Sequence, residues 1–259
     1  MTFIEAIILG IVQGITEFLP VSSSGHLKLA EHLLKLENLK SYILFDLVCH
    51  LGTLFSILIV FRQKIIESLK DQTKFFQIVL GTLPLFPLLL ILKPIKAVFN
   101  DPHYLGYCFI ITSILLYLGI KKEKAFSQIK LASASPYRDP LLIGMFQSAA
   151  ILPGISRSGS TISAAKMLGW KSDDAISFSF LLAIPAIMGG VILESYALVK
   201  SQEPSYADVA LSCYIVAFFT SFIFGYFSLS LLRRLATKQK FMYFVWYCLI
   251  LGILTAFYI

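Results

Sequence analysis

The sequence predicts an all-α integral membrane protein with six transmembrane helices and two re-entrant helical hairpins, arranged as an inverted-topology repeat. Composition is the first observation: 57% of the 259 residues are hydrophobic, 14% are charged and the mean hydropathy is +0.79. Soluble domains are about 25% charged. The second observation is a series of apolar runs, many near the ~20 residues that cross a bilayer as a helix. The third is a pair of proline-broken, serine-rich segments.

The apolar runs define the spans. Those long enough to cross are residues 42–61, 75–92, 104–120, 175–198, 207–232 and 241–259. No apolar run of the sequence has the form of a cleaved signal with a small-residue cleavage site. The first apolar segment, residues 3–19, is therefore expected to stay in the mature protein. Cysteines occur singly within these runs rather than in paired spacing, which favours packing residues over metal ligands or disulfides.

Two further apolar segments are interrupted by proline. Residues 3–19 end at Pro20, residues 140–152 end at Pro153, and short amphipathic pieces follow at 24–36 and 160–170. Proline removes a backbone donor and disfavours helix at the preceding residue. Irregular backbone at membrane depth is tolerated only where protein or a water-filled cavity surrounds it. We therefore expect re-entrant hairpins over 3–36 and 140–170, with tips that meet in a polar pocket.

The two hairpins are also related in sequence. A shift of 134 positions aligns residues 10–25 with 144–159 without a gap, and five of the sixteen pairs are identical. Ordinary composition predicts about one identity. Three spans follow each hairpin, so the second unit enters from the opposite side of the membrane. The chain is expected to be one membrane domain with repeats at about 1–121 and 139–259, and inverted repeats place their functional site at the repeat interface.

Lysine and arginine set the orientation. Loops 62–74, 121–139 and 233–240 carry thirteen of them, whereas loops 93–103 and 199–206 carry three. Cytoplasmic loops are the positive ones, so both termini are expected outside and the active site is expected to open toward the periplasm. The net charge of +7 lies in these short loops, and we therefore expect no nucleic-acid partner.

The first hairpin contains a carboxylate beside a helix start. Gln13 and Glu17 are four residues apart and share one helix face. An ionised residue within a membrane segment is costly and usually functional. Ser22, Ser23, Ser24 and Gly25 then begin a new helix, whose unpaired amides favour an anion, and His26 follows.

The second hairpin adds a guanidinium to a similar helix start. Arg157 lies among residues that could bind phosphate oxygens together with it: Ser156, Ser158, Gly159 and Thr161. Arginine is always charged and its fork matches phosphate. Because no acidic residue lies nearby in the sequence, we interpret Arg157 as an anion ligand rather than as half of a structural ion pair.

Together the hairpins supply the parts for cleaving a phosphoanhydride. Glu17, with Gln13, could hold Mg²⁺ or Ca²⁺ against phosphate oxygens. Ser23 is the expected nucleophile and His26, one turn later, its expected base, although attack by His26 or by water stays open. Asp46 and His50, one turn apart near the start of a span, could also line the pocket.

Both motifs match a known family. Residues 13–27, QGITEFLPVSSSGHL, and 153–161, PGISRSGST, closely resemble the two signature motifs of bacterial undecaprenyl pyrophosphate phosphatases of the bacitracin-resistance type. The resemblance covers essentially the whole chain. It implies a multi-pass enzyme of the bacterial inner membrane that removes the terminal phosphate of undecaprenyl diphosphate, regenerates the lipid carrier for peptidoglycan synthesis and confers bacitracin resistance.

The resemblance also carries residue roles. By position, Glu17 matches the acidic residue of the first motif, Ser23 and His26 its proposed catalytic hydroxyl and imidazole, and Arg157 the phosphate-binding arginine. Gln13 stands where some members have glutamate, so Glu17 must carry the carboxylate chemistry.

Two other functions remain open. Paired inverted hairpins are also a transporter design, so the chain could be an alternating-access carrier for undecaprenyl phosphate or another anion. A channel-like or scaffold protein would leave Glu17 and Arg157 unexplained. The sequence does not decide whether the protein forms a homodimer.

Overall fold

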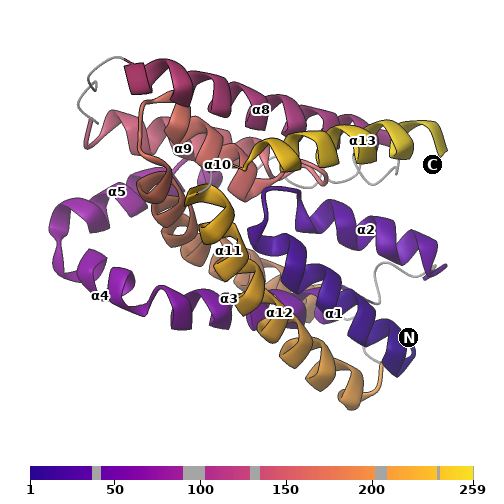
Figure 1. Ribbon diagram of the computed structural model, residues 1–259. Helices are drawn as coiled ribbons and strands as arrows, with labels where there is room; N and C mark the ends of the chain where they lie inside the picture. The colour runs from indigo at the N-terminus through magenta and orange to yellow at the C-terminus, as the bar shows by residue number, and fades with distance from the viewer. Residues whose placement is uncertain (37–41, 90–102, 129–134, 202–208, 238–239, 259) are drawn as a thin grey trace.

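The computed structural model describes residues 1–36, 42–89, 103–128, 135–201, 209–237 and 240–258. The regular elements within these residues are all α-helices, as expected (Figure 1). Their bounds are α1 Phe3–Phe18, α2 Ser23–Leu33, α3 Ile43–Val60, α4 Arg62–Lys70, α5 Gln72–Thr82, α6 Leu85–Leu89, α8 His103–Gln128, α9 Arg138–Ala149, α10 Arg157–Met167, α11 Ser172–Ser201, α12 Leu211–Thr237 and α13 Met242–Tyr258.

Both predicted helix breaks are present. Helix α1 starts with a capping box between Thr2 and Glu5 and ends at Phe18, and Ser22 then caps the start of α2. Helix α9 ends at Ala149, and Ser156 caps the start of α10. In each case the proline-containing turn separates two helices that pack on each other, α1 on α2 and α9 on α10.

The tips of the two broken segments contact each other directly, as expected. The backbone N–H of Gly154 donates to Ser22 Oγ at 3.1 Å, and Ser158 Oγ donates to the carbonyl of Leu19 at 3.2 Å. The glycines allow this approach, because a Cβ on Gly25 would lie 3.0 Å from Gly154 Cα. Segments about 130 residues apart therefore build one local structure.

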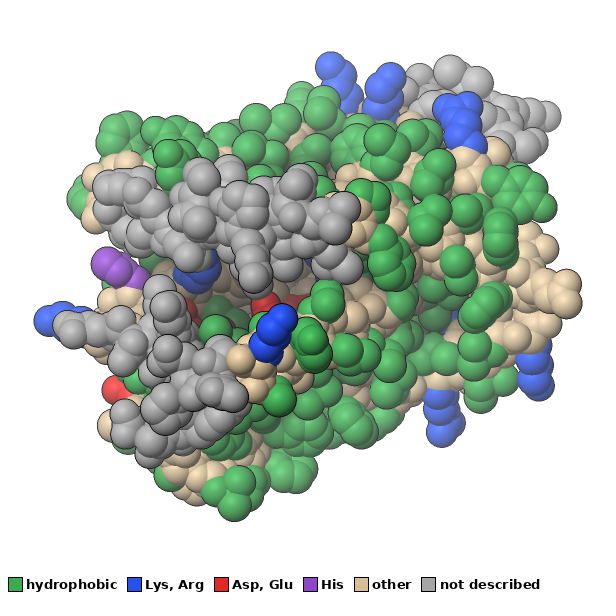
Figure 2. All heavy atoms as spheres, turned by 180° about the vertical axis from the view of Figure 1, so that it is seen from behind, with side chains coloured by type: hydrophobic (Ala, Val, Ile, Leu, Met, Phe, Trp, Pro, Cys, Tyr) green, Lys and Arg blue, Asp and Glu red, His purple; other side chains and the backbone are tan. Residues whose placement is uncertain are grey.

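Within the described residues, four helices are long and apolar enough to cross a membrane: Ile43–Val60, Tyr104–Lys122, Ser172–Lys200 and Leu211–Leu235. They correspond to four of the predicted spans, and the shorter apolar helix α13 corresponds to a fifth. Hydrophobic side chains cover much of the face shown in Figure 2. The large hydrophobic residues that are exposed in the structure include Ile192, Phe227, Trp246 and Phe257. The fold is that of a helical membrane protein.

The predicted span 75–92 is not one continuous helix. Helix α5 ends at Thr82, Leu83 and Pro84 form a turn, and α6 begins at Leu85. Proline cannot donate the helical hydrogen bond, which explains the interruption at Pro84. The end of this run and most of the following loop fall in 90–102, outside the described residues. The predicted loop 62–74 also proved largely helical, since α4 and the start of α5 lie within it.

Helix α1 lies against α12 and is fixed there by small residues. A Cβ on Gly10 would lie 2.0 Å from Thr220 Oγ1, and one on Gly14 would lie 2.8 Å from the Ser221 carbonyl oxygen. Helix α12 in turn packs on α3, and α8 packs on α13. These contacts hold the end of α1, which carries Glu17, between α3 and the second hairpin.

Candidate active site

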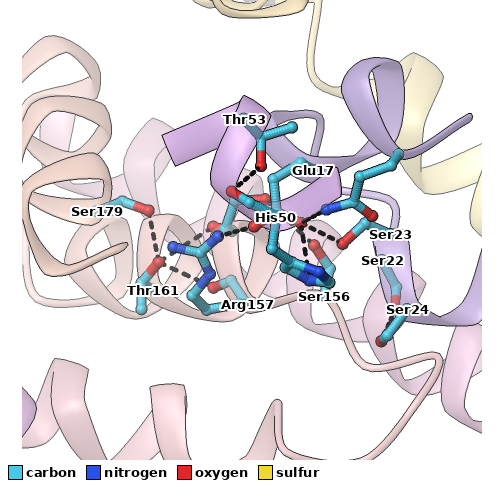
Figure 3. Close-up of polar contacts among 12 residues, drawn as sticks. Glu17, Ser22, Ser23, Ser24, His50, Thr53, Ser156, Arg157, Thr161 and Ser179 are labelled. Atoms are coloured by element: carbon cyan, nitrogen blue, oxygen red, sulfur yellow. Dashed lines mark hydrogen bonds and ion pairs between the residues drawn. The ribbon is translucent and has the colours of Figure 1, made fainter. Parts of the chain in front are cut away.

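Glu17 is the centre of a polar cluster at the meeting point of the two tips (Figure 3). It occupies the last turn of α1, and its residue surface is 6% exposed. Its Oε2 accepts hydrogen bonds from Gln13 Nε2 at 2.9 Å and from Ser23 Oγ at 2.5 Å. Arg157 binds the other carboxylate oxygen, and His50 Nε2 lies 3.9 Å from Oε2. The carboxylate thus connects α1, α2, α3 and α10.

Arg157 has an acidic partner that the sequence did not reveal. It is the first residue of α10, and its Nη2 donates to Glu17 Oε1 across a separation of 140 residues. The expectation that Arg157 is not part of an ion pair was therefore wrong, because it considered only neighbours in the sequence. A guanidinium has five N–H donors, so this bond leaves others that could bind an anion. The Arg157 side chain is 17% exposed, so it is not sealed from a ligand.

Ser23 and His26 are close in sequence but have different partners. Ser23 Oγ donates to Glu17, whereas His26 Nδ1 bonds to the Ser22 carbonyl at 2.7 Å. His26 Nε2 bonds to Tyr247 Oη, also at 2.7 Å. The structure therefore places the carboxylate, rather than the expected imidazole, against the Ser23 hydroxyl. Tyr247 was not predicted at the site, because nothing in the sequence brings α13 to the first hairpin.

His50 brings an imidazole next to the Glu17 carboxylate. It lies on α3, and its Nδ1 bonds to the carbonyl of Asp46 at 2.8 Å. A carbonyl only accepts, so Nδ1 carries the proton and Nε2 faces Glu17. The one-turn spacing of Asp46 and His50 was the sequence signal that this part of α3 could line the pocket. The packing of α3 against α1 is what brings His50 beside Glu17.

The hydroxyls predicted to bind phosphate also organise the helix starts. Ser22 Oγ accepts from the Gly25 amide and Ser156 Oγ from the Gly159 amide, at 3.4 and 3.1 Å. Ser24 and Ser158 are also equivalent between the two hairpins. The Ser24 hydroxyl lies 3.5 Å from that of Ser22, and the Ser158 hydroxyl lies 3.3 Å from that of Ser156.

Thr161 joins α10 to α11. Its Oγ1 donates to the Arg157 carbonyl at 2.9 Å and lies 2.6 Å from Ser179 Oγ. This contact fixes the helix turn that carries Arg157, so Thr161 has a clear structural role at its predicted position.

The residues around Glu17 fit a hard divalent cation only if further oxygen ligands come from elsewhere. Gln13 is fully buried and its Oε1 has no hydrogen-bond partner in the structure, which leaves an amide oxygen beside the carboxylate. Within the described part of the chain, no group of three or more His, Cys, Asp or Glu could hold a metal ion. Mg²⁺ is commonly bound by one or two protein oxygens plus water and substrate phosphates, which matches this donor set.

The cluster has the chemistry of an anion site with a potential nucleophile. A hydroxyl hydrogen-bonded to a carboxylate lies beside an arginine, at the N-termini of two helices whose first amides lack intrahelical partners. The protein is therefore a helical membrane protein with a buried site suited to phosphate groups. The comparisons identify which family this is: a family model described as bacitracin resistance protein BacA matches residues 6–254, and the chain belongs to this family.

Similar proteins extend over the full length of the chain. A protein of Protochlamydia amoebophila named undecaprenyl-diphosphatase is 51% identical over 259 residues, covering 100% of this chain and 99% of its own. Proteins with the same name from Carboxydothermus hydrogenoformans and Methanococcus vannielii are 39% and 34% identical. Each alignment covers 98% of this chain, and 96% and 100% of the respective relative.

Proposed function

We propose that this chain is an undecaprenyl-diphosphate phosphatase, which converts undecaprenyl diphosphate to undecaprenyl phosphate and inorganic phosphate. In this role it recycles the lipid carrier for peptidoglycan synthesis and confers bacitracin resistance. The names of its full-length relatives support the substrate. The observation that carries the chemistry is the bond from Ser23 Oγ to Glu17, beside the Arg157 guanidinium.

Arg157 and the two helix starts bind the terminal phosphoryl group. The guanidinium donors and the N-terminal ends of α2 and α10 act together on its oxygens, where negative charge is concentrated. Phosphoryl transfer depends mainly on positioning and on electrostatic stabilisation, which these fixed groups provide without reorganisation.

Ser23 is the nucleophile in this proposal. Its Oγ forms a bond to the terminal phosphorus, the bridging P–O bond of the anhydride breaks, and undecaprenyl phosphate leaves with the bonding electrons. The hydroxyl proton passes to Glu17, whose Oε2 already accepts it as a hydrogen bond. Water then attacks the phosphorus atom and the P–Oγ bond breaks, so that inorganic phosphate leaves and Ser23 Oγ takes back the proton from Glu17.

A divalent cation, Mg²⁺ or Ca²⁺, is proposed to bind beside the Glu17 carboxylate. Gln13 Oε1 and Glu17 would hold it, and it would offset the negative charge of the diphosphate. Gln13 also orients the Glu17 carboxylate, because its side-chain Nε2 donates a hydrogen bond to Glu17 Oε2.

The full topology is proposed as six spans plus two re-entrant hairpins in an inverted repeat, with units at about 1–121 and 139–259. The matched tips support this arrangement. Ser22 and Ser156 are equivalent under the 134-residue shift, and each caps the glycine three residues later. A Cβ on Gly25 would meet Gly154, and a Cβ on Gly159 would meet Pro20. Under the same shift Gly25 corresponds to Gly159 and Pro20 to Gly154, so each repeat makes the equivalent contact with the other.

Orientation in the bacterial inner membrane follows from charge. Thirteen lysines and arginines in three loops face the cytoplasm, so the termini and the opening of the first hairpin face the periplasm. Membrane lipid surrounds the apolar helices in this arrangement.

Phosphate release by purified protein tests the function. Protein in detergent is incubated with a long-chain prenyl diphosphate and with Mg²⁺, Ca²⁺ or EDTA, and inorganic phosphate is measured. Release by the wild-type chain and its loss in Ser23→Ala support the proposal. Folded protein that releases no phosphate contradicts it and favours a carrier, for which the Ser23–Glu17 contact has no evident use. Light scattering on the same sample measures whether a homodimer forms.

A further inference from the structure

Ser22 occupies a backbone conformation that its surroundings must hold. Its φ of 71° and ψ of 96° are unusual for a residue with a side chain. Such conformations persist when neighbouring contacts determine them, and they concentrate at functional sites. Ser22 Oγ accepts from the amides of Gly25 and Gly154, which ties the residue to both hairpins. Because Ser23 follows directly, the backbone of Ser22 decides where the Ser23 hydroxyl points.

The His26 ring holds the carbonyl of Ser22. Its Nδ1 lies 2.7 Å from that oxygen, and the His26 backbone amide donates to the same oxygen at 3.2 Å. A carbonyl cannot donate, so Nδ1 carries a proton. The neutral ring therefore accepts at Nε2, where Tyr247 Oη donates at 2.7 Å. Both ring nitrogens are engaged by groups other than Ser23.

Helices α8 and α13 enclose this ring. The His26 and Tyr247 rings are nearly parallel, with centroids 5.6 Å apart, and the Phe109 ring meets His26 edge-on at 5.2 Å. Next to Tyr247, Cys248 Sγ lies 3.8 Å from the Pro20 carbonyl. The break of the first hairpin is thus supported from α13 at two adjacent positions.

We infer that Tyr247 and His26 act as positioning residues, which hold the Ser22 backbone so that Ser23 Oγ stays against Glu17. The inference rests on the proposed function and assigns His26 a role other than proton acceptor. Tyr247 fixes the ring through Nε2, the ring fixes Ser22 through Nδ1, and Ser22 fixes Ser23. Neither residue needs to touch the substrate.

Tyr247→Phe is the first test, because it removes one oxygen atom and keeps the ring. Loss of one buried hydrogen bond corresponds to about a five- to tenfold effect. We expect kcat on a prenyl diphosphate to fall by about that factor, with KM and the pH dependence of kcat unchanged. Tyr226→Phe on α12, where the residue is exposed, is the matched control and should keep the wild-type kcat. A Tyr247→Phe enzyme as active as the control overturns the inference.

His26→Asn and His26→Ala separate positioning from proton transfer. Asparagine places an amide N–H close to the position of Nδ1, so it can still donate to Ser22 but cannot act as a base. We expect His26→Asn to keep at least about tenfold more kcat than His26→Ala, and both pH profiles to keep the wild-type shape. Equal inactivity of the two variants, with loss of one limb of the pH profile, shows that His26 is a base and overturns the inference.

NMR of ¹⁵N-histidine-labelled protein gives a readout that needs no activity. The His26 signal, assigned by its absence from His26→Asn, should be that of a ring protonated at Nδ1 and should shift in Tyr247→Phe. An Nε2-protonated ring, or no shift, overturns the inference. Wild-type protein that shows these signals but releases no phosphate would contradict the proposed function and leave the Tyr247–His26–Ser22 contacts confirmed.

Discussion

Ser23 Oγ lies 2.5 Å from Glu17 Oε2, and the two residues stand on opposite sides of the Pro20 break. An ionised carboxylate has no proton to donate, so the hydroxyl donates and its lone pairs remain available. The proline turn is what makes this contact possible. In one continuous helix, residues six apart would not share a face. The break thus brings a nucleophile and a proton acceptor together within a single hairpin.

Ser23→Ala should lower phosphate release by at least about 10³-fold, because no other group replaces the nucleophile. Rapid quench with terminally ³²P-labelled substrate should trap phosphoserine at Ser23 in the wild type. Ser230→Ala is the control, since the Ser230 hydroxyl donates to the carbonyl of Tyr226 on its own helix, α12. Substantial turnover by Ser23→Ala would indicate that His26 or water attacks instead.

Arg157→Lys should be nearly as damaging as Arg157→Ala, with each losing at least about 10²-fold in kcat/KM. Lysine keeps the charge but lacks the planar fork that can bond Glu17 and phosphate at once. Steady-state phosphate release measures the effect, and Arg62→Lys at the exposed start of α4 should have none. Near-normal turnover of Arg157→Lys would show that any positive charge suffices.

Gln13→Glu should make activity more dependent on a divalent cation. Gln13 Nε2 donates to Glu17 Oε2 at 2.9 Å, so a glutamate would place two carboxylates in contact. Like charges this close repel, and a cation between them relieves the repulsion. Activity should fall in EDTA and recover as Mg²⁺ or Ca²⁺ is added.

Gln147→Glu provides the matched control for that experiment. Gln147 is equivalent to Gln13 under the 134-residue shift and is also buried, but its Nε2 donates to the Gly81 carbonyl at 3.4 Å. Its replacement should destabilise the protein without any rescue by cation. If Gln13→Glu shows the cation dependence of the wild type, the proposed metal position is wrong.

The local features of the site could be predicted from sequence because they depend on residues close together in the chain. Pro20 and Pro153 end their helices, and Ser22 and Ser156 begin the next ones, through rules that act over a few residues. The expectation that the two tips meet, which followed from the cost of irregular backbone at membrane depth, is also confirmed.

Tertiary packing decided the features that the sequence did not show. The ion pair between Glu17 and Arg157 spans 140 residues, and the bond between His26 and Tyr247 spans 221. Helical spacing placed His26 on the Ser23 side of α2, but the ring instead bonds to Ser22 and Tyr247. The interruption at Pro84 could have been predicted, since the apolar run contained an internal proline.

Cysteine labelling tests the proposed orientation. Lys35→Cys and Lys122→Cys both place a thiol at an exposed position, whereas the four native cysteines are buried. In intact spheroplasts an impermeant maleimide should label the cysteine at position 35 and not that at position 122, because the positive loops are cytoplasmic. Both should react after lysis, and the reverse pattern in intact cells would overturn the topology.

Gly14→Ala should reduce both stability and activity. An added Cβ would lie 2.8 Å from both Phe224 Cβ and the Ser221 carbonyl oxygen, and 2.9 Å from the Gly225 amide nitrogen. Two of these atoms are backbone, so α1 must move away from α12, at a cost of about 1–3 kcal/mol. The apparent Tm in detergent should fall by several degrees. Since Glu17 lies on the next turn of α1, its contact with Ser23 should weaken and kcat should fall.

Gly189→Ala is the matched control for Gly14→Ala, because a Cβ there would have no atom within 4 Å. In the interior of α11, alanine favours helix over glycine by about 1 kcal/mol, so this variant should keep or raise the Tm and keep full activity. Equal Tm and kcat in the two variants would show that close packing of α1 on α12 does not hold the carboxylate in place.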